Sequence, residues 1–191
     1  MTTQIRLENV RITFPQVFEA KAVNGEGEPA FSATFHLPKS GHPGIALVRD
    51  TIVIAAKDKW GAKAEEIVRA LKAANRLCLH DGEEKSQYPG FKDTYFIAAR
   101  NKQRPLVVDG KRAPLTEADG KIYSGCYVNA IITLWAQDNK FGKRVNASLL
   151  GVQFFADGER LAGGGVAAAD DFEPIPQAEA SPSSGAGALF D

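Results

Sequence analysis

The sequence predicts a mainly β fold, a small barrel of short strands that is interrupted by one helical insert. Short segments of alternating apolar and polar residues recur along the chain between glycine-containing turns, which is typical of antiparallel strands. Helical spacing of apolar residues is confined to residues 43–75. Because no strand–helix–strand rhythm repeats, the pattern disfavours a parallel, doubly wound sheet.

The first strand is expected over residues 4–14. Its apolar and polar residues alternate, but the phase shifts by one at residues 8–9, which indicates a β-bulge. Beyond the bulge the apolar face consists of Val10, Ile12 and Phe14. This face is expected to join the core.

A second strand and two helices follow. Residues 24–29 have the composition of a turn, and residues 31–37 alternate as a half-buried strand. Apolar residues at helical spacing then predict helices over residues 45–60 and 62–75, with Gly61 ending the first.

The remaining pattern is again typical of strands, at residues 77–79, 95–100, 106–108, 127–135 and 144–150. The last two are the most regular and read as a hairpin. Their inward faces are expected to hold Val128, Ala130, Ile132, Leu134, Val145, Ala147 and Leu149.

These elements amount to six to eight strands with a helix inserted after the first pair. A five-stranded barrel with an inserted helix is what an OB fold looks like from sequence. We therefore expect one OB-type domain over residues 1–165, with its helical insert at residues 43–75. Residues 166–191 are expected to form a disordered tail, because they are acidic, rich in Ala, Ser and Gly, and without periodicity.

Charge is divided unevenly between these two parts. All 23 Lys and Arg lie in residues 1–165 with 18 of the 23 acids, so a body of net charge +5 precedes a tail of −5. A basic body favours a polyanionic ligand, and an acidic tail can compete for the same surface or recruit partners. The tail residues assigned to partner binding are Asp170, Asp171, Glu173, Phe190 and Asp191.

Signals for catalysis are weak. No nucleophile motif, phosphate-binding loop or paired zinc-ligand motif occurs, since the Cys78-x-His80 pair has no second pair to complete it. We expect no enzyme activity and no cofactor. A Mg²⁺-dependent nuclease is the less favoured alternative. Its candidate metal ligands are Asp81, Glu83, Glu84 and Asp93. The segment around the first three has the composition of an ordinary solvated turn.

The composition also bears on the compartment. Cys78 and Cys126 are too few for a disulfide framework and are expected to be reduced, buried thiols. No apolar run is long enough for a transmembrane helix, and the first residues lack the features of a secretory signal. These observations favour a cytoplasmic protein with no membrane partner.

Aromatic and basic residues interleave in two places, residues 88–104 and residues 140–144. Proteins that bind single strands combine a positive groove for the backbone with aromatic faces for the bases. Many of the 17 aromatic residues must belong to the core, and strand parity places Phe96 outward with Arg100. The candidate nucleic-acid contacts are Phe91, Lys92, Phe96, Arg100, Lys102, Arg104, Tyr127, Trp135, Lys140, Phe141, Lys143 and Arg144.

Three blocks in succession carry a family resemblance: LCLHDGEEK, YPGFKDTYFIAARNKQRPLVVDG and YSGCYVNAIITLWAQDNKFGKRVNASLLGVQFFADGERLAGG. Within them stand Asp81-Gly82, Arg104-Pro105 and the tripeptides at residues 123–125 and 151–153. In the order of these blocks, residues 7–164 resemble a family of bacteriophage single-stranded DNA-binding proteins, similar in plan to that of T7-type phages.

The resemblance implies an OB fold and sequence-independent binding and protection of single-stranded DNA during phage replication and recombination in an infected bacterial host. It also implies an acidic C-terminal tail that ends in an aromatic residue, contacts phage or host replication proteins and screens the groove. Phe190 followed by Asp191 fits this pattern, although the tail is only mildly acidic. Homo-oligomerisation is left open, and a phage structural or adaptor protein is the alternative function.

Overall fold

A computed structural model describes residues 3–23 and 25–161 of the chain. The expected tail, with Asp170, Asp171, Glu173, Phe190 and Asp191, lies outside these residues. The helices and strands are β1 (Gln4–Val23), β2 (Glu26–Pro38), α1 (Gly44–Trp60), α2 (Ala64–Ala73), β3 (Leu79–Asp81), β4 (Thr94–Asn101), β5 (Leu106–Val108), β6 (Tyr127–Asn139) and β7 (Gly142–Ala156).

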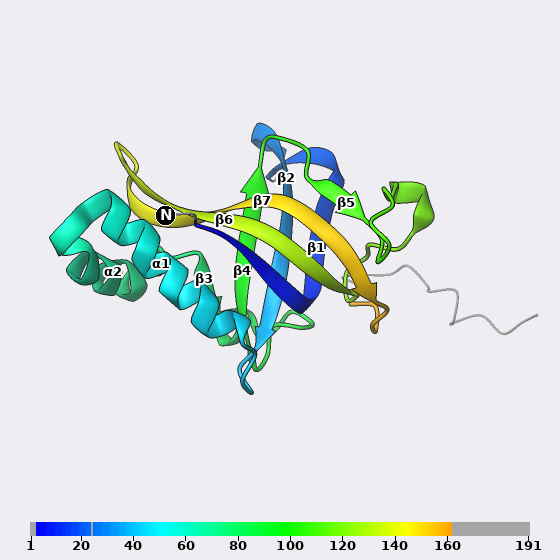
Figure 1. The fold of residues 1–191 in the computed structure, drawn as a ribbon, viewed down its shortest axis with the longest axis horizontal. Coiled ribbons are helices and arrows are strands. Elements are labelled where there is room, and N and C mark those ends of the chain that lie inside the picture. The colour runs from blue at the N-terminus through cyan, green and yellow to red at the C-terminus, as the bar shows by residue number, and fades with distance from the viewer. Residues whose placement is uncertain (1–2, 24, 162–191) are drawn as a thin grey trace, which may run out of the picture.

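The strands of the described residues form one sheet in the order β3-β4-β2-β1-β6-β7-β5 (Figure 1). Every ladder is antiparallel except the one between β5 and β7. β7 curves back against β4, where the Asn101 Nδ2 donates a 2.9 Å hydrogen bond to the Leu149 carbonyl. The barrel of β1, β2, β4, β6 and β7 is thus closed in the strand order of an OB fold. The predicted mainly β, OB-type fold with a helical insert is confirmed.

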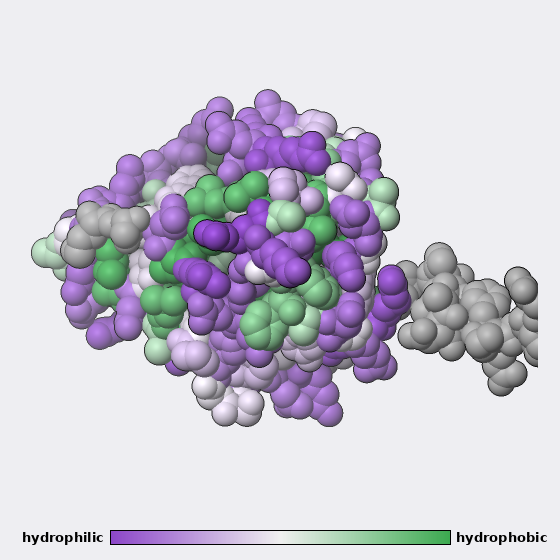
Figure 2. All heavy atoms as spheres, turned by 45° about the vertical axis from the view of Figure 1, so that its right-hand side comes forward, coloured by the Kyte–Doolittle hydropathy of each residue, from purple (hydrophilic) through white to green (hydrophobic). Residues whose placement is uncertain are grey.

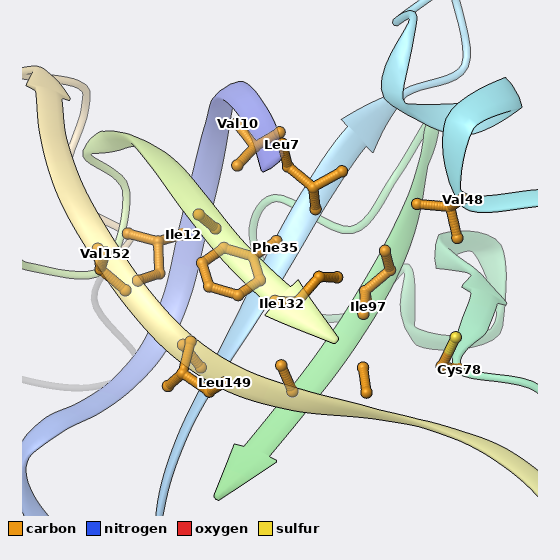
Figure 3. Close-up of a cluster of buried hydrophobic side chains, with 14 of the residues drawn as sticks. Leu7, Val10, Ile12, Phe35, Val48, Cys78, Ile97, Ile132, Leu149 and Val152 are labelled. Atoms are coloured by element: carbon orange, nitrogen blue, oxygen red, sulfur yellow. The ribbon is translucent and has the colours of Figure 1, made fainter. Parts of the chain in front are cut away.

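Alternating residues of the strands build most of the barrel core, a cluster of which is shown in Figure 3. The inward residues predicted for β6 and β7 are all buried, from Val128 to Leu149. On β4, Ile97 and Ala99 enter the core and Tyr95 packs against it, which leaves Phe96 on the outward face as strand parity predicts.

The first strand confirms one expectation and corrects another. The predicted bulge lies between Leu7 and Val10, with Asn9 in the left-handed region at φ 50°. Phe14, however, does not continue the core face of Val10 and Ile12, because its side chain is 53% exposed. A second register shift begins after Thr13, and a φ of 49° at Phe14 turns this residue outward.

The helical insert lies at one end of the barrel, beside the β6–β7 hairpin (Figure 1). Helix α1 buries Val48 and Ile52 against the core and ends at Gly61, as predicted. The Trp60 indole N–H donates a 2.9 Å hydrogen bond to the Asp138 carboxylate of β6. The end of α1 therefore holds the hairpin in place.

No helix in the described part of the chain is long and apolar enough to cross a membrane.

His36 occupies a buried polar site on the outward face of β2. Its ring lies 2.7 Å from the Thr13 hydroxyl and 3.4 Å from the Thr94 hydroxyl, and Phe91 packs edge-on at 4.6 Å between ring centroids. Burial, with a smaller contribution from Arg11, lowers the pKa of His36 from 6.5 to about 4. The ring is therefore neutral when the folded protein is at neutral pH.

This site predicts a pH-dependent stability. As pH falls from 6.5 towards 4, the unfolded chain binds a proton at His36 and the folded chain does not, so stability is lost across this window. The loss approaches about 3 kcal/mol near pH 4, at 1.36 kcal/mol per pKa unit. Urea unfolding between pH 7.5 and 4 measures it, and a His36→Gln variant should show a shallower pH dependence. Equal dependences for the two proteins would contradict this account.

Candidate nucleic-acid interface

A groove of about 920 Å³ crosses the outward face of β4, between the start of β2 and the β6–β7 hairpin. In OB folds, the face of the second and third barrel strands and the flanking loops bind oligonucleotides. The structure brings five of the sequence-predicted contact residues together along this groove: Arg100, Lys102, Trp135, Phe141 and Arg144.

The positive charges at one side of the groove are held by Glu28, near the start of β2. The Arg100 guanidinium donates a 2.7 Å hydrogen bond to the Glu28 carbonyl, and Lys102 forms an ion pair with the Glu28 carboxylate. A hydrogen bond from Lys102 holds the pKa of Glu28 below its ordinary value. Both side chains of this pair are largely exposed, so an incoming phosphate meets a cation whose present partner is held weakly.

Two aromatic rings stand at the other side with exposed faces. Trp135 is 43% exposed, and its indole N–H donates a 3.0 Å hydrogen bond to the Ser148 hydroxyl, which fixes the ring plane. Phe141 is 69% exposed at the hairpin tip. The following Gly142 has a φ of 96°, and a Cβ there would lie 2.5 Å from Arg76 Nη1. The glycine thus permits the turn that presents Phe141.

Sequence reasoning missed several residues of this groove. Arg76 lies between α2 and β3, where its carbonyl accepts a 3.2 Å hydrogen bond from the Val145 N–H of β7. It has no place in a strand or helix pattern, so periodicity gives no signal for it. The other lining residues not predicted as contacts include His80, Asn101, Gln137 and Asn146.

His80 adds a neutral ring to the groove. The ring stacks on Phe96 with centroids 5.1 Å apart, and its Nδ1 lies 2.7 Å from the Asn75 side-chain oxygen. Burial is the main cause that lowers the pKa of His80, with Lys85 and Arg144 acting in the same direction against Glu84. The ring therefore offers a stacking surface rather than a charge.

Three further predicted residues do not line the groove. Lys140 is exposed on the hairpin, with its ammonium 5.1 Å from the Phe141 ring centroid. Lys143 pairs with Asp138 at 2.9 Å, the carboxylate that Trp60 also binds. Arg104 is exposed in the segment that follows β4.

Lys92 and Tyr127 lie elsewhere. Lys92 is exposed in the loop before β4. Tyr127 begins β6, at the end away from the hairpin, where the Arg11 guanidinium lies 5.8 Å from its ring centroid and Gly158 packs against the ring. Neither residue lines the groove.

Phe91 and Phe96 do not fit a stacking role, because they are only 1% and 5% exposed. Phe96 points outward from β4 as predicted, but residues 82–93 fold over it and place Phe91 edge-on at 5.0 Å. This close covering requires Gly82, because a Cβ there would lie 1.9 Å from the Phe91 carbonyl oxygen. Strand parity predicted the direction of Phe96 but could not reveal its cover.

The acidic residues weighed as a Mg²⁺ site are engaged in structural contacts. Asp81 accepts a 2.6 Å hydrogen bond from Lys39, and Glu83 accepts one of 2.8 Å from the Asp93 backbone N–H. Glu84 accepts a 2.8 Å hydrogen bond from Asn75. Within residues 3–23 and 25–161, no group of three or more His, Cys, Asp or Glu side chains is arranged to hold a metal.

A second hollow of about 540 Å³ lies where β5 packs beside β7. It is lined by two arginines, Arg6 and Arg112, and by the exposed side chains of Leu106 and Ile131. Figure 2, with the β5 side turned forward, shows such hydrophobic areas among strongly hydrophilic ones. None of the lining residues is aromatic, so this hollow lacks the rings that stacking requires.

Comparisons with known proteins show the family of this chain. Residues 3–182 match the family described as Enterobacter phage Enc34, ssDNA-binding protein. Over 178 residues, the chain is 44% identical to protein p50 of Acyrthosiphon pisum secondary endosymbiont phage 1, covering 92% of this chain and 96% of that protein.

Solved structures give the same result. The single-stranded DNA-binding protein from bacteriophage Enc34, in complex with ssDNA, is similar with a TM-score of 0.72 and 32% identity, over 84% of this chain and 90% of that chain. The single-stranded DNA-binding protein gp2.5 of bacteriophage T7 shares the fold, with a TM-score of 0.54 and 14% identity, over 95% of this chain and 100% of that chain. The chain therefore belongs to the Enc34-type family of phage single-stranded DNA-binding proteins.

Proposed function

We propose that this chain binds single-stranded DNA in the groove over β4, without sequence preference and without catalysis, and protects it during phage replication and recombination. The observation that carries the proposal is the pairing of two exposed rings, Trp135 and Phe141, with the cations Arg100 and Arg144 along one groove. The similarity to an Enc34 protein solved with ssDNA supports the same ligand.

Binding has two contributions, stacking of bases on the rings and neutralisation of phosphates by the cations. Each base stacked on a ring contributes ~1–3 kcal/mol, and every base has a face to offer, so stacking tolerates any sequence. The groove amides are poorly placed to read bases, because Gln137 accepts a 3.1 Å hydrogen bond from Asn146, and Asn101 donates to the Leu149 carbonyl. These amides therefore offer few free donors or acceptors for distinguishing one base from another.

We also propose separate roles for the two parts of the chain. Residues 1–165 act as the binding domain, and the acidic residues 166–191 compete for the groove or recruit phage or host replication proteins. The support is electrostatic, because the two parts carry opposite net charges of five units.

The rings and the salt response test the groove together. Trp135→Ala and Phe141→Ala should each weaken oligo-dT binding by about 5-fold or more, since ~1 kcal/mol of stacking is lost. With about five phosphates neutralised, log K should fall with log salt at a slope near −3.5 in wild type and in both variants. Fluorescence anisotropy of labelled oligo-dT across a salt series measures both quantities.

The matched control is Phe155→Ala, which removes a ring that is 54% exposed near the end of β7 away from the hairpin. Its affinity should equal that of wild type. A flat salt response would argue against phosphate contacts, and no binding by wild type at low salt, with a defined oligomer, would favour the adaptor alternative.

The Glu28 carboxylate should oppose DNA binding, because it occupies Lys102 at the groove edge. Glu28→Gln should therefore tighten oligo-dT binding by about 2- to 5-fold at low salt, the range of a weak surface pair. The gain should shrink as salt rises. Glu65→Gln, an exposed change on α2, serves as the control for altered net charge. An equal gain in both variants would assign the effect to net charge alone.

Removing residues 166–191 should tighten oligo-dT binding at low salt, because a tethered polyanion is lost. The full chain and residues 1–165 are compared in one anisotropy titration. Unchanged affinity would leave the tail as a docking or solubilising segment only.

A further inference from the structure

Phe14 combines two unfavourable properties. Its φ of 49° lies in the left-handed region, which bulky side chains rarely adopt. Such a conformation is strained and persists only where the surrounding structure imposes it. The ring recovers only part of this cost by burial, because it is 53% exposed. An Asn or Gly would adopt the same backbone more readily, so stability alone does not explain a phenylalanine at this position.

The strands place Phe14 close to the groove. Thr13 pairs with Thr34 of β2, and Gln16 pairs with Ser32, so Phe14 lies in the irregular segment between these two pairs. Ser32 in turn pairs with Arg100 of β4, which lines the groove. With strands about 4.8 Å apart, Phe14 stands roughly 10 Å from the strand that carries Arg100.

A series of rings connects the two places. His80 in the groove stacks on Phe96 at 5.1 Å, and Phe96 meets Phe91 at 5.0 Å. Phe91 then lies 6.2 Å from Phe14 and 6.1 Å from Tyr88. The two rings in the middle are buried, whereas Phe14 and Tyr88 at the far end are exposed.

Cations accompany this series of rings. The Lys85 ammonium lies 5.4 Å from the Phe96 centroid and 6.0 Å from the Phe91 centroid. Lys92, next to Phe91 in sequence, is exposed. The surface beyond the groove therefore also combines exposed rings, Phe14 and Tyr88, with nearby exposed cations, Lys85 and Lys92.

We propose that Phe14 is a base-stacking residue that, together with Tyr88, extends the path of single-stranded DNA from the groove across β2 onto β1. The proposal rests on the proposed function of the groove. It assigns the buried Phe91 and Phe96 a supporting role, since they form the packed base on which the exposed rings lie. It also explains why an exposed aromatic is kept in a left-handed conformation.

The test uses the full chain and two lengths of oligo-dT, about 5 and about 16 nucleotides, near the two ends of the range of OB-fold site sizes. Phe14→Asn should weaken binding of the longer oligonucleotide by about 5-fold or more and leave the shorter one unchanged. Because Asn adopts the left-handed region more readily, its melting temperature should equal or exceed that of wild type. Phe14→Tyr should retain wild-type affinity for both lengths.

Controls separate this inference from the proposed function. Phe155→Asn should change neither affinity, and Trp135→Ala should weaken both. If Phe14→Asn binds the longer oligonucleotide as tightly as wild type while Trp135→Ala does not, the inference is overturned and the groove stands. If wild type binds neither length, the proposed function itself fails.

A second measurement does not depend on the stability of a variant. Wild-type protein is cross-linked by ultraviolet light to a 16-nucleotide oligo-dT that carries bromodeoxyuridine, and the adducts are mapped by peptide mass spectrometry. Adducts on the peptide that contains Phe14 support the extended path. Adducts confined to peptides of the groove overturn it.

Discussion

The seam where β7 meets β4 is the constraint on which the rest of this structure depends. In the described residues no strand ladder joins the two, so the barrel is closed by individual contacts instead. Asn101 of β4 donates a hydrogen bond to the Leu149 carbonyl of β7. Beside this seam, the Val145 N–H of β7 donates to the carbonyl of Arg76, in the segment between α2 and β3. A continuous ladder would bring the two strands together along their whole length. Because β4 and β7 meet only at individual contacts, space remains beside them for the groove, which residues of both strands line.

The outward face of β2 and β4 is divided by residues 82–93. These residues cover His36 and Phe96 and leave Ala98 and Arg100 open to the groove. The division is sharp because Gly82 lets the covering loop approach to backbone contact. One sheet face thus carries both the buried His36, whose protonation makes stability depend on pH, and the open surface of the candidate groove. The same alternation of side chains serves stability at one end of the strand and lines the candidate groove at the other.

The sequence predicted those features that alternation along a single strand encodes. The inward residues of β6 and β7, the bulge at Asn9 and the outward direction of Phe96 all follow from local periodicity. Periodicity does not say which outward face a distant loop will cover, so the burial of Phe96 was not foreseen. It also misjudged Phe14, because the left-handed backbone that turns this ring outward is rare for a non-glycine residue and leaves no mark in the pattern.

The acidic residues around the groove bear on how a ligand enters it. Lys102 is paired with Glu28 and Lys143 with Asp138, and all four side chains are substantially exposed to solvent. Such pairs are weak in water, so under the proposed function a phosphate would replace the carboxylate at little cost, and the carboxylate would return when the phosphate leaves. In that proposal, binding is an exchange of anions rather than the filling of an empty positive channel. In this proposed exchange, release of the strand would leave Lys102 and Lys143 paired with Glu28 and Asp138 again.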